Sequence, residues 1–233
     1  MKRSPGHTSA SSRRTTFYIA IGMAALIAVI VLFELVGSPA LEVPEFVDLK
    51  SDRTSIAMSR TEITFAQYDE FALATGQQIP LSMGWGRGNQ PVINVNWYDA
   101  VAYADWLGQV LDETVRLPTS KEWEIATGGN GDTKFAFGDC LTTDDANFDT
   151  RVSFADCDVE SSFLGKPAPV GSYRANYDGL FDVHGNVSEW TSDCLAPSRT
   201  ISQCDVRGIQ GGSWGNGPHH LQLTQRGGAS AEM

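Results

Sequence analysis

The stretch Gly179–Trp190, which reads GLFDVHGNVSEW, carries the most specific structural signal in this chain of 233 residues. Its centre, Gly185–Glu189, is rich in turn-forming residues and predicts a loop. Consecutive loop residues present backbone carbonyl oxygens, and Glu189 adds one carboxylate. Oxygen ligands of this kind suit calcium, which accepts irregular coordination. The stretch therefore predicts either a calcium-binding loop or a loop that Glu189 organises by accepting backbone N–H groups.

Three short helices are predicted before this stretch. They are expected over residues 65–74, 97–107 and 121–127, after the capping residues Thr64, Asn96 and Thr119. Thr64 and Thr119 are each followed three residues later by Gln or Glu, which is the capping-box pattern. In the first two helices, apolar residues recur at three- and four-residue spacing, so each helix has one face to bury.

The composition changes after residue 130, where Gly, Asp and Asn are dense and apolar runs shorten to 135–137, 170–173 and 179–183. This texture is typical of long loops with a few short strands. Loops of that length need cross-links, metal ions or bound partners to hold them. Helices followed by irregular β structure predict an α+β fold.

The segment 17–36 is predicted to cross a membrane as one helix. Residues 17–33 are free of charge, and a helix through residue 36 is roughly 30 Å long, which matches the core of a bilayer. A cleavable signal peptide with its site near Pro39 is the alternative, but the apolar stretch is longer than a signal-peptide core. The predicted organisation is a basic cytoplasmic tail at 1–16, the transmembrane helix, a linker at 37–54 and a domain at 55–233.

The charge distribution places the domain outside the cytoplasm. Four basic residues precede the apolar run, namely Lys2, Arg3, Arg13 and Arg14. By the positive-inside rule the N-terminus is cytoplasmic, so we expect a single-pass protein of a bacterial inner membrane with its domain in the periplasm. The 17 bases less these four, and the 28 acids less Glu34, leave 13 bases and 27 acids after residue 36. Such a domain repels phosphate, so no nucleic-acid partner is expected.

Four cysteines follow the apolar run: Cys140, Cys157, Cys194 and Cys204. An oxidising compartment permits disulfides, and the short spacings favour the pairs 140–157 and 194–204, although four cysteines allow three connectivities. A zinc site is less consistent with the sequence, because no C-x-x-C motif occurs and an acidic, extracytoplasmic context favours disulfides.

Five segments together resemble the formylglycine-generating enzyme (sulfatase-modifying factor) family, whose domain is a variant of the C-type-lectin fold. In the family's order they are MSRTEITFAQY at 58–68, PVINVNWYDA at 91–100, RLPTSKEWE at 116–124, GLFDVHGNVSEW at 179–190 and GGSW at 211–214. Each segment is weak alone, but five in this order identify the chain as a member of the family. The resemblance implies an α+β domain with long loops and few short strands.

The resemblance also implies a calcium site at the GN loop, a name used here for residues 184–189. In the family the matching loop binds calcium through carbonyl oxygens and the Glu. Carried over to this sequence, the ligands are Glu189 and the carbonyl oxygens of His184, Gly185 and Val187. Calcium is therefore the cofactor we expect.

A second calcium site in the family would begin here at Asn147 and Phe148 and close near Phe163. Just before the closing position the family has an Asp, whereas this chain has Ser161 and Ser162. Asp158 or Glu160 could substitute for that Asp, but its absence just before the closing position puts this second site in doubt.

The catalytic cysteines of the family are absent from this sequence. Family enzymes convert a sulfatase cysteine to formylglycine with oxygen, using two cysteines just beyond GGSW. Those positions hold Asn216 and Leu221, and neither an amide nor an alkane binds copper(I) or exchanges thiols. Trp190 and Ser213 match positions near the family's oxygen pocket but would only shape a cavity. We assign no catalytic residue and expect no copper.

The sequence therefore favours a non-catalytic binding or scaffold module with a protein or peptide partner, held at the membrane by residues 17–36. The alternative is a sulfatase-maturing oxidase with another ligand set, for which His219 and His220 are the candidates. The family's terminal strand is expected to be missing, because the sequence reaches Met233 where that strand should begin.

Overall fold

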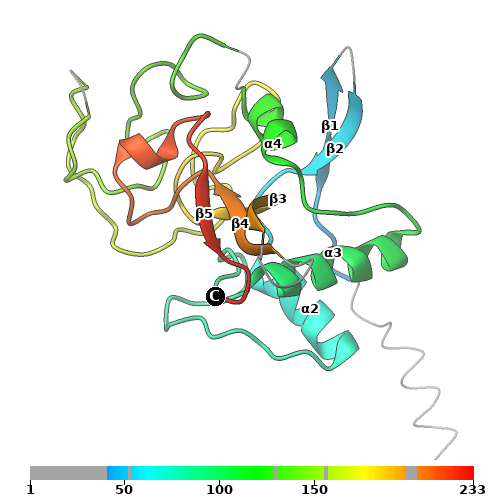
Figure 1. The fold of residues 1–233 in the computed structure, drawn as a ribbon. Helices are drawn as coiled ribbons and strands as arrows, with labels where there is room; N and C mark the ends of the chain where they lie inside the picture. The colour runs from blue at the N-terminus through cyan, green and yellow to red at the C-terminus, as the bar shows by residue number, and fades with distance from the viewer. Residues whose placement is uncertain (1–40, 52–53, 129–130, 155–156, 198–203) are drawn as a thin grey trace, which may run out of the picture. The chain divides into compact units, whose positions relative to one another are not determined.

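The computed structural model describes residues 41–51, 54–128, 131–154, 157–197 and 204–233. The chain divides into two units, Met1–Leu41 and Glu42–Met233. The predicted cytoplasmic tail and transmembrane helix lie outside the described residues. Within the described ranges, no helix is both long and apolar enough to cross a membrane. The second unit contains a β-hairpin, helices, long loops and a C-terminal sheet (Figure 1).

An antiparallel hairpin of β1 (Phe46–Ser51) and β2 (Thr54–Ser59) opens the domain. Strand β1 lies inside residues 37–54, which we predicted to be a linker, so the predicted boundary was wrong. Val47 and Leu49 alternate with charged residues, and this period of two is the pattern of a half-buried strand. Leu49 is buried in a small apolar cluster, which anchors the hairpin to the rest of the domain.

Three predicted helices are confirmed: α2 (Phe65–Thr75), α3 (Trp97–Leu111) and α4 (Ser120–Thr127). All three have a complete capping box, in which the side chain of Thr64, Asn96 or Thr119 accepts a backbone N–H three residues later. These bonds satisfy N–H groups that the helix itself leaves unpaired. Helix α3 ends later than predicted, where Asp112 adopts a left-handed conformation.

Helices α2 and α3 pack through aromatic side chains. The ring centroid of Phe71 on α2 lies 5.7 Å from that of Tyr103 and 5.6 Å from that of Trp106 on α3. Tyr68 stacks on Tyr103 at 5.8 Å. Burial of each large side chain contributes roughly 1.5–3 kcal/mol. This contact follows from the three- and four-residue spacing of the apolar residues.

The C-terminal sheet is antiparallel and has the order β3-β4-β5, formed by Glu189–Pro197, Cys204–Gln210 and Gly227–Ser230. Glu189 lies opposite Gln210, so the sheet begins at the end of the GN loop. Strand β5 pairs with β4 from Gly227 to Ser230, and the absence of the family's terminal strand beyond it stays a prediction.

The residues described between α4 and β3 are long loops around a small apolar core. This core comprises Phe135, Leu141, Ala146, Phe148, Phe154 and Leu221. Leu221 belongs to the short 3-10 helix η1 (Pro218–Leu221), so the C-terminal segment closes over the loops. The prediction of cross-linked long loops is confirmed, although the apolar runs 135–137, 170–173 and 179–183 form no strand.

Candidate functional site

Asn186, at the centre of the GN loop, is fully buried and hydrogen-bonds three distant segments. Its Nδ2 donates to Glu62 Oε2 at 2.6 Å and to the Ala168 carbonyl at 3.2 Å. Its Oδ1 accepts the Ala168 N–H at 2.8 Å and Asn147 Nδ2–H at 3.1 Å. The backbone is left-handed here, with φ 51°, a conformation that Asn adopts more readily than most residues. Sequence reasoning placed Asn186 in the loop but gave it no role.

Three acidic side chains gather beside the GN loop. Glu189 Oε2 accepts Trp123 Nε1–H at 2.7 Å, and Asp182 Oδ2 accepts the Gly171 N–H at 2.6 Å. Burial raises the pKa of Asp182 to about 6, and burial together with the charge of Asp182 raises the pKa of Glu189 to about 7. Burial, with the charges of Asp182 and Glu189, also holds the pKa of Glu62 well above its usual range. The three carboxyl groups are therefore close enough to repel one another.

The GN loop fits the oxygen chemistry of calcium. Asp182 Oδ1 is buried without a hydrogen-bond partner, and the carbonyl oxygens of Gly185 and Val187 accept no hydrogen bond from a described residue. Within the described part of the chain, no three His, Cys, Asp or Glu side chains form a group that could hold a metal ion. A cation here would therefore use Asp182, Glu189 and backbone carbonyls. The sequence did not single out Asp182 as a ligand candidate, although Asp182 lies within the segment Gly179–Trp190.

The ring of His184 clamps the loops together. Its Nε2 accepts the Ala136 N–H at 2.9 Å, which places the ring proton on Nδ1, 2.7 Å from the Leu221 carbonyl. Burial lowers the pKa of His184 to about 4, so the ring is neutral at pH 7. Both nitrogens are engaged, which restricts the predicted ligand role of His184 to its backbone carbonyl.

The residues of the doubtful second calcium site, Asn147 and Phe148, are both buried and line a cavity of about 50 Å³. Asn147 Nδ2 donates to the Lys166 carbonyl at 3.0 Å as well as to Asn186. Ser162 also lines the cavity, whereas no carboxylate of a described residue does. The two predicted sites are joined, because Asn147 belongs to one and bonds Asn186 of the other.

The two positions that hold cysteines in the family lie in different environments. Asn216 is half-buried, and its Oδ1 accepts both the N–H and the hydroxyl of Ser213 at 2.9 Å. Leu221 is fully buried in the apolar core under the loops. Neither side chain offers a ligand for a soft metal.

The four cysteines form two disulfides, Cys140–Cys157 and Cys194–Cys204, with Cα atoms 5.6 and 5.7 Å apart. The favoured pairing is confirmed. The first bond crosses the loops beside the small apolar core, and the second joins β3 to β4. These cysteines are cross-links, and none is free.

The residues that match the family's oxygen pocket both have structural hydrogen bonds. Trp190 Nε1 donates to the Val95 carbonyl at 3.1 Å, which fixes β3 to the segment before α3. Ser213 holds Asn216. Because the indole and the hydroxyl are both engaged, each residue positions its neighbours.

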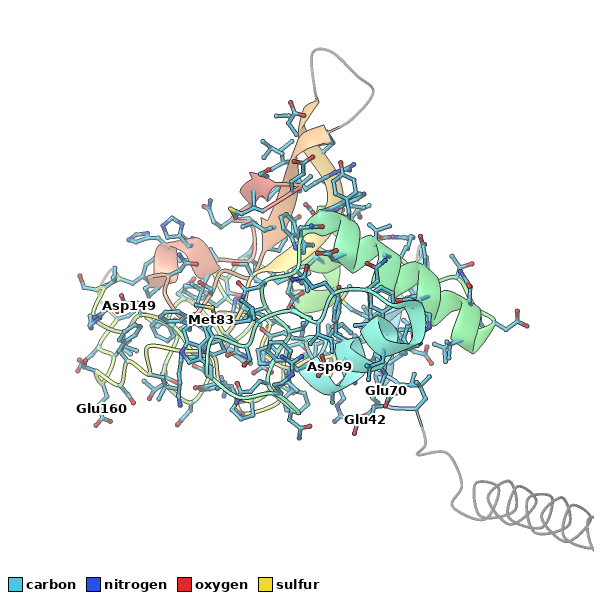
Figure 2. All side chains as sticks on the ribbon, turned by 90° about the horizontal axis from the view of Figure 1, so that it is seen from below. Glu42, Asp69, Glu70, Met83, Asp149 and Glu160 are labelled. Carbon is cyan, nitrogen blue, oxygen red and sulfur yellow. A yellow bond between two sulfur atoms is a disulfide. The ribbon has the colours of Figure 1, made fainter. Side chains whose placement is uncertain are left out.

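An aromatic surface, defined by Trp85, Phe163 and Trp214, adjoins Asn216. The rings of Trp85 and Trp214 pack edge to face with centroids 5.5 Å apart, and Phe163 lies 6.0 Å from Trp214. The Arg151 guanidinium covers Phe163 at 3.8 Å. Figure 2 shows Met83, which is exposed and two residues before Trp85. Sequence reasoning missed this surface, because its rings come from three loops with no shared motif.

Fold and site together define an α+β domain organised around a buried GN loop. The family of sulfatase-modifying factor enzyme 1-like domains matches residues 44–233, and the chain belongs to that family. The predicted resemblance is thus confirmed. In the solved structure of PvdO from Pseudomonas aeruginosa the fold aligns with a TM-score of 0.61 at 22% identity, over 81% of this chain and 86% of PvdO.

Relatives in the family differ in their described roles. The chain is 40% identical over 117 residues to the formylglycine-generating enzyme of Streptomyces coelicolor, covering 48% of this chain and 35% of that protein. It is 35% identical over 145 residues to the inactive C-alpha-formylglycine-generating enzyme 2 of Mus musculus, covering 58% and 43%. It is 30% identical over 154 residues to the serine/threonine-protein kinase Pkn1 of Chlamydia trachomatis, covering 60% and 22%. The chain spans less than half the length of each of these relatives.

Proposed function

We propose that this chain is a non-catalytic binding or scaffold module that residues 17–36 anchor in a membrane. The observation that carries the proposal is the lack of sulfur at positions 216 and 221, where an amide and a buried Leu stand. The four cysteines are consumed in cross-links, so no thiolate pair is available to copper(I). The likeness to a mouse protein described as inactive supports this reading.

The partner is a protein or peptide that docks on the aromatic surface beside Asn216. Aromatic side chains dominate the energetics of protein interfaces, and exposed apolar groups mark interaction sites. Trp85 and Trp214 are partly exposed. Asn216 Nδ2 donates no hydrogen bond to a described residue, so it is placed to bond a peptide carbonyl.

The test uses the full chain in lipid nanodiscs. Copper(I) binding is measured by chelator competition, and oxygen consumption is measured with a cysteine-containing sulfatase peptide. We expect no copper uptake and no turnover, together with binding of peptides from a display library.

Trp214→Ala should weaken peptide binding by about thirtyfold, as loss of an aromatic hot spot does. Tyr177→Ala, at a fully exposed aromatic that packs on none of these rings, should leave it unchanged. Robust turnover with the peptide would overturn the proposal.

Calcium at the GN loop is part of the same proposal. At a concentration of 100 times its Kd, bound calcium would raise stability by about 2.7 kcal/mol, or roughly 5–10 °C in Tm. Asp182→Asn or Glu189→Gln should abolish the difference in Tm between calcium and chelator. Asp178→Asn, at an exposed acid outside the loop, should preserve it. A Tm that chelator leaves unchanged in the unmodified chain argues against the site.

A second candidate function is the sulfatase-maturing oxidase, favoured by the 40% identity to a formylglycine-generating enzyme. It would need ligands other than cysteine. His219 packs edge to face against Phe154 with ring centroids 4.7 Å apart, and His220 is exposed. If this candidate is right, the peptide assay shows oxygen consumption that His219→Ala or His220→Ala removes.

The location and integrity of the N-terminus test the proposed membrane anchor. We propose that residues 1–16 remain in the cytoplasm of a bacterium and that residues 55–233 face the periplasm. Protease added to spheroplasts should then digest the domain but spare a tag fused before Met1. A mature protein that begins near residue 40 would instead establish a cleaved signal peptide.

A further inference from the structure

The cavity beside Asn147 is lined by neutral groups. Its volume is about 50 Å³, and its polar lining comes from Thr143, Asn147, Thr150, Ser162 and Tyr173. The Asn147 amide nitrogen is committed to the Lys166 carbonyl and to Asn186, and its Oδ1 accepts no hydrogen bond from a described residue. Neutral oxygens therefore face a space that has room for at least one water molecule.

Two acids that lie close to this cavity in sequence are paired with arginines. Asp145 Oδ1 lies 2.6 Å from the Arg174 guanidinium. Asp149 is held by Arg151 through two bonds of 2.8 Å. Neither acid lines the cavity, and neither do Asp158 and Glu160, so none of the described residues that line it supplies a carboxylate to replace the water that a divalent cation must lose.

We infer that this cavity, where the family resemblance implies a second calcium ion, holds water in this chain and excludes calcium. Calcium affinity rises with the number of charged ligands, and the described residues that line the cavity offer none. Water needs only two to four polar partners, which Asn147 Oδ1 and the hydroxyls of Thr143 and Tyr173 supply. One carboxylate at Ser162 would therefore convert the cavity into a calcium site. The two sites share a hydrogen bond between Asn147 and Asn186, but the inference does not require calcium at the GN loop.

The experiment counts calcium ions bound per full chain in nanodiscs by equilibrium dialysis. Ser162→Asp adds a carboxylate at the cavity wall. Ser161→Asp adds the same charge to the neighbouring residue, which does not line the cavity. Ser162→Asn keeps the shape without the charge. Each variant is also measured in a second background that carries Asp182→Asn and Glu189→Gln, so that calcium at the GN loop does not contribute.

We expect Ser162→Asp to bind one calcium ion more than the unmodified chain in both backgrounds, and the two controls to bind no more. The added ion should bind at least roughly tenfold tighter than calcium binds to the Ser161→Asp chain, and it should raise Tm only in Ser162→Asp. The inference is overturned if the chain with only Asp182→Asn and Glu189→Gln still binds one calcium ion through its native cavity. It is equally overturned if Ser162→Asp gains none. A chain that binds calcium only after Ser162→Asp supports the inference and refutes the proposed GN-loop site.

Discussion

Replacing Asn186 by Ala should be among the most destabilising single changes in this domain. The side chain is fully buried and makes four hydrogen bonds. Its removal leaves Glu62 Oε2 and both backbone groups of Ala168 without these partners, whereas Asn147 Nδ2 keeps the Lys166 carbonyl. Each buried polar group that loses its partner costs about 1–3 kcal/mol.

The three orphaned groups together should lower the free energy of unfolding by about 3–9 kcal/mol. In a domain of this size that corresponds to a fall in Tm of at least roughly 6 °C. Thermal unfolding followed by circular dichroism measures the change. Asn89→Ala is the matched control, because Asn89 is exposed and its side chain bonds no described residue, so its effect should stay within about 0.5 kcal/mol.

A loss below about 1 kcal/mol in Asn186→Ala would refute this reasoning. It would mean that water replaces the amide, or that the loop relaxes without cost. Either result would mean that the hydrogen bonds of Asn186 do not hold the segment around Glu62 to the long loops.

Three further predictions concern the glycine beside Asn186, the cap of α4 and the loop disulfide. Gly185→Ala should unfold or severely destabilise the domain, because φ at Gly185 is 76° and a Cβ would lie 2.1 Å from the Asn147 carbonyl oxygen. The control is Gly215→Ala, whose Cβ would meet open space, and it should be neutral in the same melting assay. Arg116 lowers the pKa of Glu122 to about 2. The Glu122 carboxylate therefore stabilises the fold fully above pH 4.5, and this stabilisation is lost as the pH falls toward 2. Glu122→Gln should lower the free energy of unfolding by about 1 kcal/mol at pH 7 and by almost nothing at pH 2. Reducing Cys140–Cys157, which closes a loop with a sequence separation of 17, should cost about 3 kcal/mol, and Cys140→Ser with Cys157→Ser should reproduce that loss.

Local sequence signals predicted the elements whose causes are themselves local. The capping residues Thr64, Asn96 and Thr119 lie next to the helices that they start, and the helix ends differ from prediction by only a few residues. Strand β1 was missed because Pro39 and Pro44 suggested a tether, although the alternation of side chains after them was visible.

The candidate site depends on contacts that no local pattern encodes. Glu62 meets Asn186 across 124 positions of sequence, and Trp123 meets Glu189 across 66. The resemblance located the loop, yet the unpaired oxygen of Asp182 and the aromatic surface around Trp214 emerged only when distant loops came together. Long-range pairing of loops is set by tertiary packing, which sequence periodicity does not report.

The environment of Leu221 adds a packing argument to the proposed lack of oxidase chemistry, beside the argument from ligand type. Leu221 fills the core under the loops, its carbonyl is 2.7 Å from the His184 ring, and its Cδ1 would lie 2.8 Å from a Cβ on Gly212. A cysteine at position 221 would remove buried carbon at a cost of about 2–3 kcal/mol and would leave its sulfur in a dry interior. Asn216 is only half-buried, so a cysteine there would be a single thiol without a partner. A copper site made by cysteines at these two positions would therefore require η1 to be repacked, whereas the proposed binding on the aromatic surface would use the fold as it stands.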